Sequence, residues 1–446
     1  MSSRPDRKQY RLTVIFLCDI LTTDYRSEEK PRMKYRFRRI SPRNISYYKL
    51  FIAYGIIMIV VFHTINLIYH GTLLRGILLN PMNAFDDHFM HIGYASTPFG
   101  TNIYALDENA CFPPLAYLMY AFLARCVGYQ ADDPTDTNAH QTAFYNMTVY
   151  IMFTAVCIIL IVYAASLYIK KKGFINQVVF PCILIFTYPI CCAAIQRGNS
   201  VLLTVPLIAI AIAWRNDGSR LKRELALVII AVAAGLKIYP ALLGLLYIKE
   251  RRWKETLRLL IYGVILFFVP FIFFGGLEGF KTFLQTLINL GGEVHRSSFS
   301  GMIEAVTKGL FGKTIHEFTV MMQQLFLVLC LVTFFITKDK WGEILSLCSL
   351  MAVYISSSWM YTCVYIIPVV LVFFAEKDEK PIRINKDNWT DLIGFILFLC
   401  VFSYTYGLNY RFIFDSISVL TTLYCIVTIS KFVYRKILHK ISAAPT

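Results

Sequence analysis

Long apolar runs, separated by short polar connections, organise this chain from residue 48 to residue 434. Several runs approach the ~20 residues that a helix needs to cross the hydrocarbon core of a bilayer. They are continuous rather than alternating in period two, so they predict membrane-spanning helices and not a barrel. The predicted spans are residues 48–69, 113–128, 144–169, 174–195, 200–214, 225–248, 257–275, 318–337, 341–357, 359–375, 391–408 and 412–434.

The composition agrees with this pattern. Of the 446 residues, 57% are hydrophobic and 16% are charged, whereas soluble domains are about half apolar and about a quarter charged. No polar stretch is long enough for a soluble domain of ordinary size. We therefore predict an all-α, polytopic transmembrane protein with about 11–13 spans.

The net charge of +16 comes from Lys and Arg that gather in short connections between apolar runs. This is the positive-inside bias of membrane proteins, so it excludes nucleic acid as the expected partner. The bias predicts a cytoplasmic basic segment 1–43, a membrane domain 44–434 and a cytoplasmic tail 435–446. Met33 opens a second basic start, so we expect residues 1–32 to be dispensable. Residues 70–112 and 275–317 are the long loops on the outer side.

Two runs resist a simple topology. Run 225–248 has basic loops at both ends and is broken at 235-GLKIYP-240, where Pro interrupts a helix. It is expected to enter and leave on one side, as two short half-helices. Run 113–128 is the second case, because a full crossing there would put Lys170–Lys172 outside, against the charge bias. Either this run does not cross, or another short connection is misplaced.

The first outer loop carries two adjacent acids, Asp86 and Asp87, and ends in a rigid Phe-Pro-Pro sequence. One acid could cap a helix; the other could be a general base that activates a hydroxyl, or a metal-bound carboxylate. His91 follows Asp87 by four residues, which on a helix puts both on one face. Two such residues are not a complete metal site, so a locally hydrogen-bonded His91 is favoured, although a divalent cation such as Mg²⁺ or Mn²⁺ remains open.

Two basic residues stand out inside apolar surroundings. Arg197 lies in 196-QRGNS-200, between two apolar runs on the expected outer side. It is either a snorkelling residue at a helix end or a bidentate phosphate ligand. Lys237 lies at the break of 235-GLKIYP-240, and ionisable residues at membrane depth are functional candidates by default. Snorkelling without function is the alternative, and a contact with a lipid phosphate is the hypothesis that we carry forward.

Two later outer segments supply further candidates. His295 lies in 291-GGEVHRSSFSGM-302, a sequence that suits either a mobile lid over a polar substrate or an ordinary surface loop. Arg411 lies at the outward end of a late span. Trp359 and Tyr361 lie at a similar position, where aromatic residues usually form an interfacial belt.

The order of these motifs resembles the GT-C glycosyltransferases that use polyprenyl-phosphate sugars. The similarity rests on the acid loop with 91-HIGYAS-96, the 112-FPP-114 return, the RGN of 196-QRGNS-200, 235-GLKIYP-240 and a basic turn with Arg-Trp. It covers roughly residues 45–370. The bacterial branch with the mycobacterial mannosyltransferases that act on phosphatidylinositol mannosides is the most similar. The KIYP element is also similar to one in the eukaryotic GPI mannosyltransferase, and 358-SWMYTCVYIIP-368 resembles a later span of the bacterial branch.

The resemblance implies an outer-loop carboxylate that acts as base on an acceptor hydroxyl while polyprenyl phosphate leaves with inversion at the sugar. Asp87 matches that position best, with Asp86 in reserve, because this chain departs from the family in its paired acids and in His88. Arg197, Lys237 and Arg411 are implied for the donor phosphate and His295 for the sugar. The expected partners are a polyprenyl-phosphate-sugar donor, a glycan or glycolipid acceptor and membrane lipids. The sugar is a hexose such as mannose, and the active site faces outward from the cell membrane. A transporter or flippase of lipid-linked saccharides, without catalysis, is the alternative.

Overall fold

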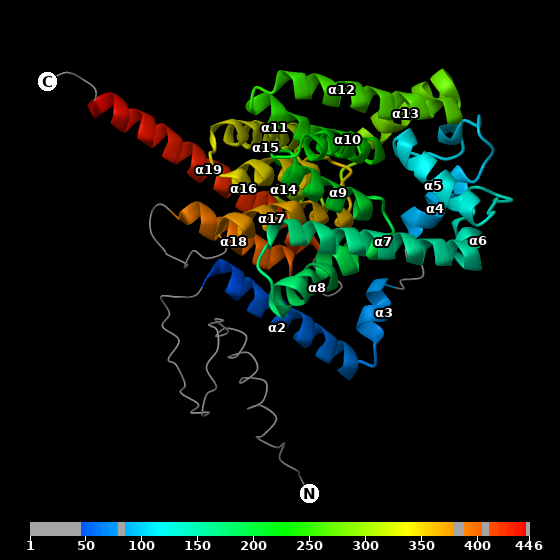
Figure 1. Cartoon of the computed structure of the whole chain (residues 1–446), viewed down its shortest axis with the longest axis horizontal. Helices are drawn as coiled ribbons and strands as arrows, with labels where there is room; N and C mark the ends of the chain where they lie inside the picture. Colours follow the sequence, from blue (N-terminus) through cyan, green and yellow to red (C-terminus); the bar gives the residue numbers. More distant parts are fainter. Residues whose placement is uncertain (1–45, 79–84, 378–387, 404–409, 443–446) are drawn as a thin grey trace, which may run out of the picture.

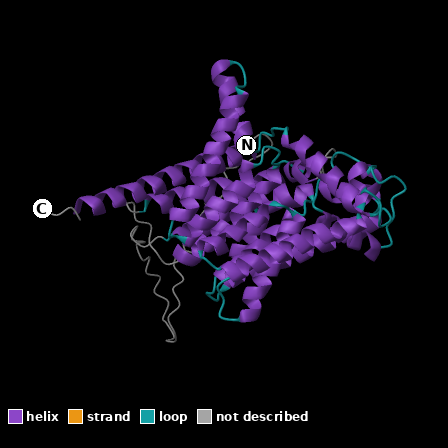
Figure 2. Ribbon diagram, turned by 90° about the horizontal axis from the view of Figure 1, so that it is seen from above, coloured by secondary structure: helices purple, strands orange, loops and turns teal. Residues whose placement is uncertain are grey.

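The computed structural model describes residues 46–78, 85–377, 388–403 and 410–442. These residues form helices joined by short connections, without a β-sheet among them, which confirms the all-α prediction (Figure 2). The longer helices are α2 (Tyr47–Ile68), α7 (Phe144–Tyr168), α9 (Val201–Trp214), α10 (Arg220–Leu236), α12 (Trp253–Phe268), α13 (Gly276–Gly291), α15 (His316–Ile336) and α19 (Tyr410–Ser442). Helices of 10 to 13 residues are α4 (Asp86–Ala95), α5 (Pro114–Cys126), α14 (Phe299–Phe311), α16 (Lys340–Ser349), α17 (Ile366–Lys377) and α18 (Trp389–Val401).

Short elements complete the chain. Four are brief α-helices: α3 (Thr72–Leu78), α6 (Thr137–Thr142), α8 (Phe180–Phe186) and α11 (Gly244–Lys249). The others are 3₁₀ or π turns: η2 (Ile103–Ala105), η3 (Ile175–Val179), η4 (Tyr188–Ile195), η5 (Tyr239–Leu243), η6 (Val269–Phe273), η7 (Leu350–Tyr354) and η8 (Met360–Tyr365). Most of these turns continue an apolar run after a Pro or a bend, so they interrupt helices that the hydropathy pattern predicts as continuous.

Six helices in the described ranges are long and apolar enough to cross a membrane, and a bent pair that includes α8 and η4 makes a seventh if it counts as one span. This confirms a polytopic membrane protein but gives fewer spans than the 11–13 predicted. The difference has a physical cause, because several apolar runs are divided into shorter helices. The run 113–128 forms the 13-residue α5, and the run 225–248 is divided at Lys237. The end of run 391–408 lies outside the described residues.

Burial separates central from peripheral helices. The segment Met360–Lys377, which contains η8 and α17, is 72% buried, whereas Trp253–Phe273 is 17% buried. Figure 1 accordingly shows α17 in the middle of the bundle and α12 along one edge. Apolar side chains on such an edge face either lipid or a partner. In a bilayer this arrangement places α17 among other helices and α12 against lipid.

A cluster of charged groups joins three basic connections at one end of α9. Arg215 lies 3.1 Å from Glu250 and 3.7 Å from Glu343, and Lys249 lies 2.8 Å from Glu343. Arg252 donates to the backbone carbonyl of Arg215 at 3.0 Å. The chain therefore returns after Lys237 to the end from which α10 began, as predicted for run 225–248.

The acid loop lies at the opposite end of α9. Helix α9 starts next to the RGN loop and spans 14 residues, which is about 21 Å at 1.5 Å per residue. Helix α7 runs between the same two ends, because Tyr150 bonds to the carbonyl of Ile195 and Tyr168 bonds to that of Ala209. Lys170–Lys172 therefore follow α7 at the basic end, and the conflict over run 113–128 disappears because α5 does not cross. Which end faces the cytoplasm stays a prediction.

Candidate active site

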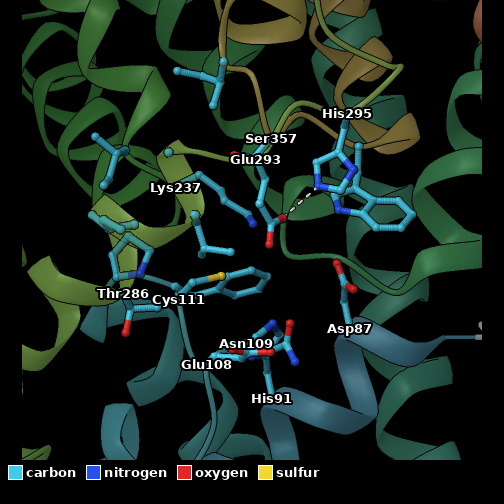
Figure 3. Close-up of a pocket in the computed structure, with 18 of the residues that line it drawn as sticks. Asp87, His91, Glu108, Asn109, Cys111, Lys237, Thr286, Glu293, His295 and Ser357 are labelled. Carbon is cyan, nitrogen blue, oxygen red and sulfur yellow. Dashed lines mark hydrogen bonds and ion pairs between the residues drawn. The ribbon is translucent and has the colours of Figure 1, made fainter. Parts of the chain in front are cut away.

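A cavity of about 500 Å³ lies at the acid-loop end of the bundle, between the start of α4, the loop before α5, the Lys237 turn, the end of α13 and the turn before η8 (Figure 3). Its walls carry acids, bases and amides together with apolar and aromatic residues. Asp87, His91, Arg197, Lys237 and His295 all line it, although the sequence separates the first from the last by more than 200 positions. The other lining residues used below are Asn109, Phe112, Asn289, Glu293, Trp359 and Tyr361.

The two acids occupy the first turn of α4, and the N-cap residue is Phe85 in a left-handed conformation. Neither acid is therefore the cap, which was the alternative for one of them. The positive end of the helix dipole favours both carboxylates. Asp87 faces the cavity, whereas Asp86 is not among the lining residues. Of the two acids, the one that lines the cavity is Asp87, which the resemblance favoured over Asp86.

Arg197 binds both acids. Its Nε lies 2.6 Å from Oδ1 of Asp87, and its Nη1 lies 3.1 Å from Oδ2 of Asp86. Asn199, two residues later, donates to Oδ2 of Asp87. The Asp87 side chain is 7% exposed, so a buried carboxylate is neutralised on one side and hydrogen-bonded on the other. Burial raises the pKa of Asp86, and the nearby Arg197 opposes this shift.

A close fit between α4 and the RGN loop fixes this geometry. The backbone N–H of Phe85 donates to the carbonyl of Gln196 at 2.7 Å. Gly198 has a φ of +71°, and a Cβ built on it would lie 2.8 Å from the Cβ of His88. Glycine is thus required both by the left-handed backbone and by the packing. The close approach at Gly198 therefore positions the adjacent Arg197 next to Asp87.

Lys237 ends α10 and reaches the cavity from the opposite side. Lys237 is 7% exposed. Its Nζ lies 3.4 Å from the ring centre of Phe112 and 5.5 Å from that of Tyr361. Within the described ranges no carboxylate lies within ion-pair distance of it. The positive charge of this buried ammonium is stabilised mainly by aromatic faces, so it can bind an anionic group of a ligand.

Glu293 and His295 form a pair that the sequence analysis did not assign. His295 Nε2 lies 3.2 Å from Oε2 of Glu293, and its ring centre lies 5.0 Å from that of Trp359. The backbone N–H of His295 donates to the carbonyl of Ser356 at 2.8 Å, so the loop after α13 is attached to the turn before η8. Both side chains line the cavity and point into it (Figure 3). The signal in the sequence was the Glu-x-His spacing in that loop.

Of the two remaining candidates, His91 lines the cavity and Arg411 does not. His91 is buried on the cavity floor, where its Nδ1 shares a 3.1 Å hydrogen bond with the Tyr117 hydroxyl. Burial lowers the pKa of His91, so the ring is neutral at pH 7; this fits the prediction of a locally bonded histidine. Arg411 is exposed at the start of α19 and does not line the cavity. The structure therefore brings together two of the three basic residues proposed for the donor phosphate.

In the described part of the chain, the side chains are not arranged as a metal site. Among the described residues, no group of three or more His, Cys, Asp or Glu side chains is arranged to hold a metal ion. The carboxylates of Asp86 and Asp87 bind Arg197 instead. The step proposed below is therefore derived from protein groups alone.

Comparison with known proteins gives one match. The model of glycosyltransferase family 87 matches residues 111–357, which is more than half of the chain. Arg197, Lys237, Glu293 and His295 lie inside this range, whereas Asp86, Asp87, His91 and Arg411 lie outside it. Searches of the curated proteins and of the solved structures found no match.

Proposed function

The chain belongs to glycosyltransferase family 87, and from this premise we propose that it transfers a sugar from a polyprenyl-phosphate donor to a glycan or glycolipid acceptor. The observation that carries the proposal is the convergence of Asp87, Arg197 and Lys237 on one cavity within a polytopic helical bundle. A lipid-linked donor needs an apolar environment for its chain, cations for its phosphate and a base beside its sugar. These three requirements meet at this end of the molecule.

The cations define a donor side of the cavity. Lys237 carries a charge without a carboxylate counter-ion in the described part of the chain, and Arg197 is a guanidinium, which binds phosphate oxygens in bidentate geometry. A phosphodiester between them would be stabilised as its leaving oxygen gains charge. Arg197 then exchanges part of its contact with Asp86 and Asp87 for the phosphate, and this exchange frees Oδ1 of Asp87 to accept a hydrogen bond from the acceptor hydroxyl.

Asp87 is the proposed general base. The acceptor hydroxyl attacks C1 of the sugar and gives its proton to a carboxylate oxygen of Asp87. The bond from C1 to the phosphate oxygen breaks, that oxygen keeps the bonding electrons, and polyprenyl phosphate leaves with inversion at C1. No additional reactant is required, because the phosphate is already a good leaving group.

Further polar residues that line the cavity are proposed to bind the acceptor. Glu293, His295, Asn109 and Asn289 present hydrogen-bonding groups of the kind that sugar hydroxyls require. Trp359 offers an aromatic face beside them and also lies 4.9 Å from the guanidinium of Arg197. Mannose as the sugar, an outward-facing active site and a GT-C architecture follow from the sequence resemblance and are part of the proposal.

The direct test is cleavage of the donor by purified protein in liposomes. Radiolabelled polyprenyl-phosphate mannose and glucose are supplied separately with a membrane glycolipid fraction as acceptor, and free polyprenyl phosphate and labelled glycolipid are measured. The proposal expects equal amounts of both products with one of the sugars. Movement of intact donor across the bilayer without cleavage would instead support a transporter.

A further inference from the structure

A second cavity, of about 600 Å³, lies at the basic end of the bundle, away from the site described above. The ends of α15, α17 and α19, together with the starts of α16 and α18, form its walls. Five cationic and two acidic side chains line it, namely Lys338, Lys377, Lys431, Arg435, Lys436, Asp339 and Asp391. The lining therefore has three net positive charges, and the proposed sugar transfer uses none of these residues.

The charges in this cavity are unevenly compensated. Lys377 lies 2.8 Å from Asp391, and both are largely buried, so this pair neutralises itself. Lys338 and Arg435 have no ion pair with any described residue, and Lys436 lies 5.7 Å from the ring of Phe432. These three side chains can thus supply charge to a ligand without breaking an existing salt bridge.

The surroundings of the cavity indicate where it lies relative to the bilayer. The span candidate Arg411–Ile437 of α19 includes three of the basic lining residues near its end, Lys431, Arg435 and Lys436. Apolar residues alternate with them, and Tyr434 is 64% exposed. Trp389, 49% exposed, begins α18 beside the cavity. Exposed Tyr and Trp at the ends of spans are typical of the level of the lipid headgroups.

Helix α19 extends beyond the rest of the bundle at this end (Figures 1 and 2). Near its end, the exposed apolar residues Phe432, Val433 and Ile437 alternate with the cations that line the cavity. A lipid matches both surfaces at once, with acyl chains along the exposed apolar residues and a headgroup in the cavity. Basic pockets between spans are known to bind anionic headgroups.

We propose that this cavity binds the phosphate headgroup of an anionic membrane lipid. Lys338, Arg435 and Lys436 contact the phosphate, and the Lys377–Asp391 pair forms the polar floor. The lipid holds α19 against α15 and α18. The proposal is independent of the sugar-transfer chemistry, because the two cavities lie at opposite ends of the bundle.

The test measures lipid binding to the purified full-length protein by native mass spectrometry, with phosphatidylglycerol or phosphatidylcholine added in detergent. The variant replaces Lys338, Arg435 and Lys436 by Gln. A matched control replaces Lys281, Lys308 and Lys313, three exposed lysines outside both cavities, by Gln. Each basic residue contributes about fivefold to binding of an anionic lipid, so we expect the variant to bind phosphatidylglycerol at least roughly tenfold more weakly, and the control to bind as the wild type does.

A second readout distinguishes loss of the lipid site from misfolding of the variant. Bound phosphatidylglycerol should raise the thermal unfolding midpoint of the wild type and of the control but not that of the variant, while all three proteins unfold at the same midpoint in phosphatidylcholine. Inorganic phosphate at millimolar concentration should not displace the lipid. Equal phosphatidylglycerol binding by variant and control, equal binding of both lipids, or displacement by inorganic phosphate would each overturn the proposal.

Discussion

The Nε of Arg197 lies 2.6 Å from Oδ1 of Asp87, and the same guanidinium reaches Asp86 at 3.1 Å. In this state the proposed base is held by the proposed phosphate ligand. Arg197 occupies Oδ1 of Asp87 and Asn199 donates to Oδ2, so under our proposal the donor has to compete for Arg197 before an acceptor hydroxyl can reach this carboxylate. Donor binding and activation of the base are thus coupled through one side chain.

Replacement of Lys237 tests the donor side. Lys237→Gln removes a cation that lies within a hydrophobic and aromatic environment, and a hydrogen bond to a charged group contributes about 1.5–3 kcal/mol. We expect the KM for the polyprenyl-phosphate donor to rise roughly tenfold to a hundredfold, with little change in the KM for the acceptor. The matched control, Lys281→Gln, removes an exposed lysine that pairs with Glu278 and should leave both constants unchanged. An unchanged donor KM in Lys237→Gln would contradict the assignment.

Replacement of Glu293 tests the acceptor side. Glu293→Gln weakens both the contact with His295 and any hydrogen bond to a sugar hydroxyl, so we expect the acceptor KM to rise about tenfold while the donor KM stays the same. Glu278→Gln, an exposed acid on the preceding helix, is the control. A rise in the donor KM alone would show that Glu293 binds the donor and not the acceptor, which would contradict this assignment.

Gly198 provides a test of how the site is built. In Gly198→Ala, the new Cβ would meet His88 at 2.8 Å, on a backbone with φ of +71°. Left-handed strain of this kind costs about 1–3 kcal/mol, so the thermal midpoint should fall by several degrees and transfer activity should fall with it. Gly218→Ala, which has no heavy atom within 4 Å of its Cβ, should change neither. Equal midpoints for the two variants would show that the contact with His88 is unimportant.

His88 predicts a dependence of stability on pH. Burial lowers the pKa of His88 to about 3, whereas the unfolded side chain titrates near 6.5. Because the unfolded state binds the proton more tightly, stability is complete above pH 6.5 and is lost as the pH falls toward 3. The loss from this residue is about 2 kcal/mol at pH 5, at 1.36 kcal/mol per pKa unit.

His88→Phe keeps a ring of similar size and removes the titration. Thermal unfolding at pH 7 and pH 5 should therefore show a smaller decrease in the variant than in the wild type. Some decrease will remain, because burial also lowers the pKa of His91. A decrease of the same size in both proteins would show that His88 is not buried in its neutral form.

Hydropathy and charge were sufficient to predict the helical class and to sort the loops between two ends of the bundle. They also singled out Arg197 and Lys237, which both line the cavity, because each is a charged group in a setting where charge is costly. Fewer described helices reach a membrane-crossing length than the number of predicted spans, because a run of apolar residues does not show where a Pro or a bend divides a helix. The run 225–248 was recognised through Pro240, but the short α5 has no comparable internal signal.

The sequence also did not show in which direction each side chain points from its helix or loop. Arg411 and Arg197 both follow outward ends of predicted spans, yet one is exposed at the start of α19 and the other is buried beside Asp87. Glu293 was overlooked because its spacing from His295 does not show that both side chains face one cavity until the loop folds against the turn before η8. The choice between Asp86 and Asp87 likewise required the direction in which each side chain of α4 points.

Donor cleavage by Asp87→Asn, compared with Asp86→Asn, is the most direct test of this account. The two variants remove the same charge from adjacent residues that both contact Arg197, but one carboxylate faces the cavity and the other does not. We expect Asp87→Asn to lower kcat by a factor of about 10²–10⁴, the usual contribution of a general base, and Asp86→Asn to retain activity within about tenfold of the wild type. Full activity in Asp87→Asn would contradict the central claim.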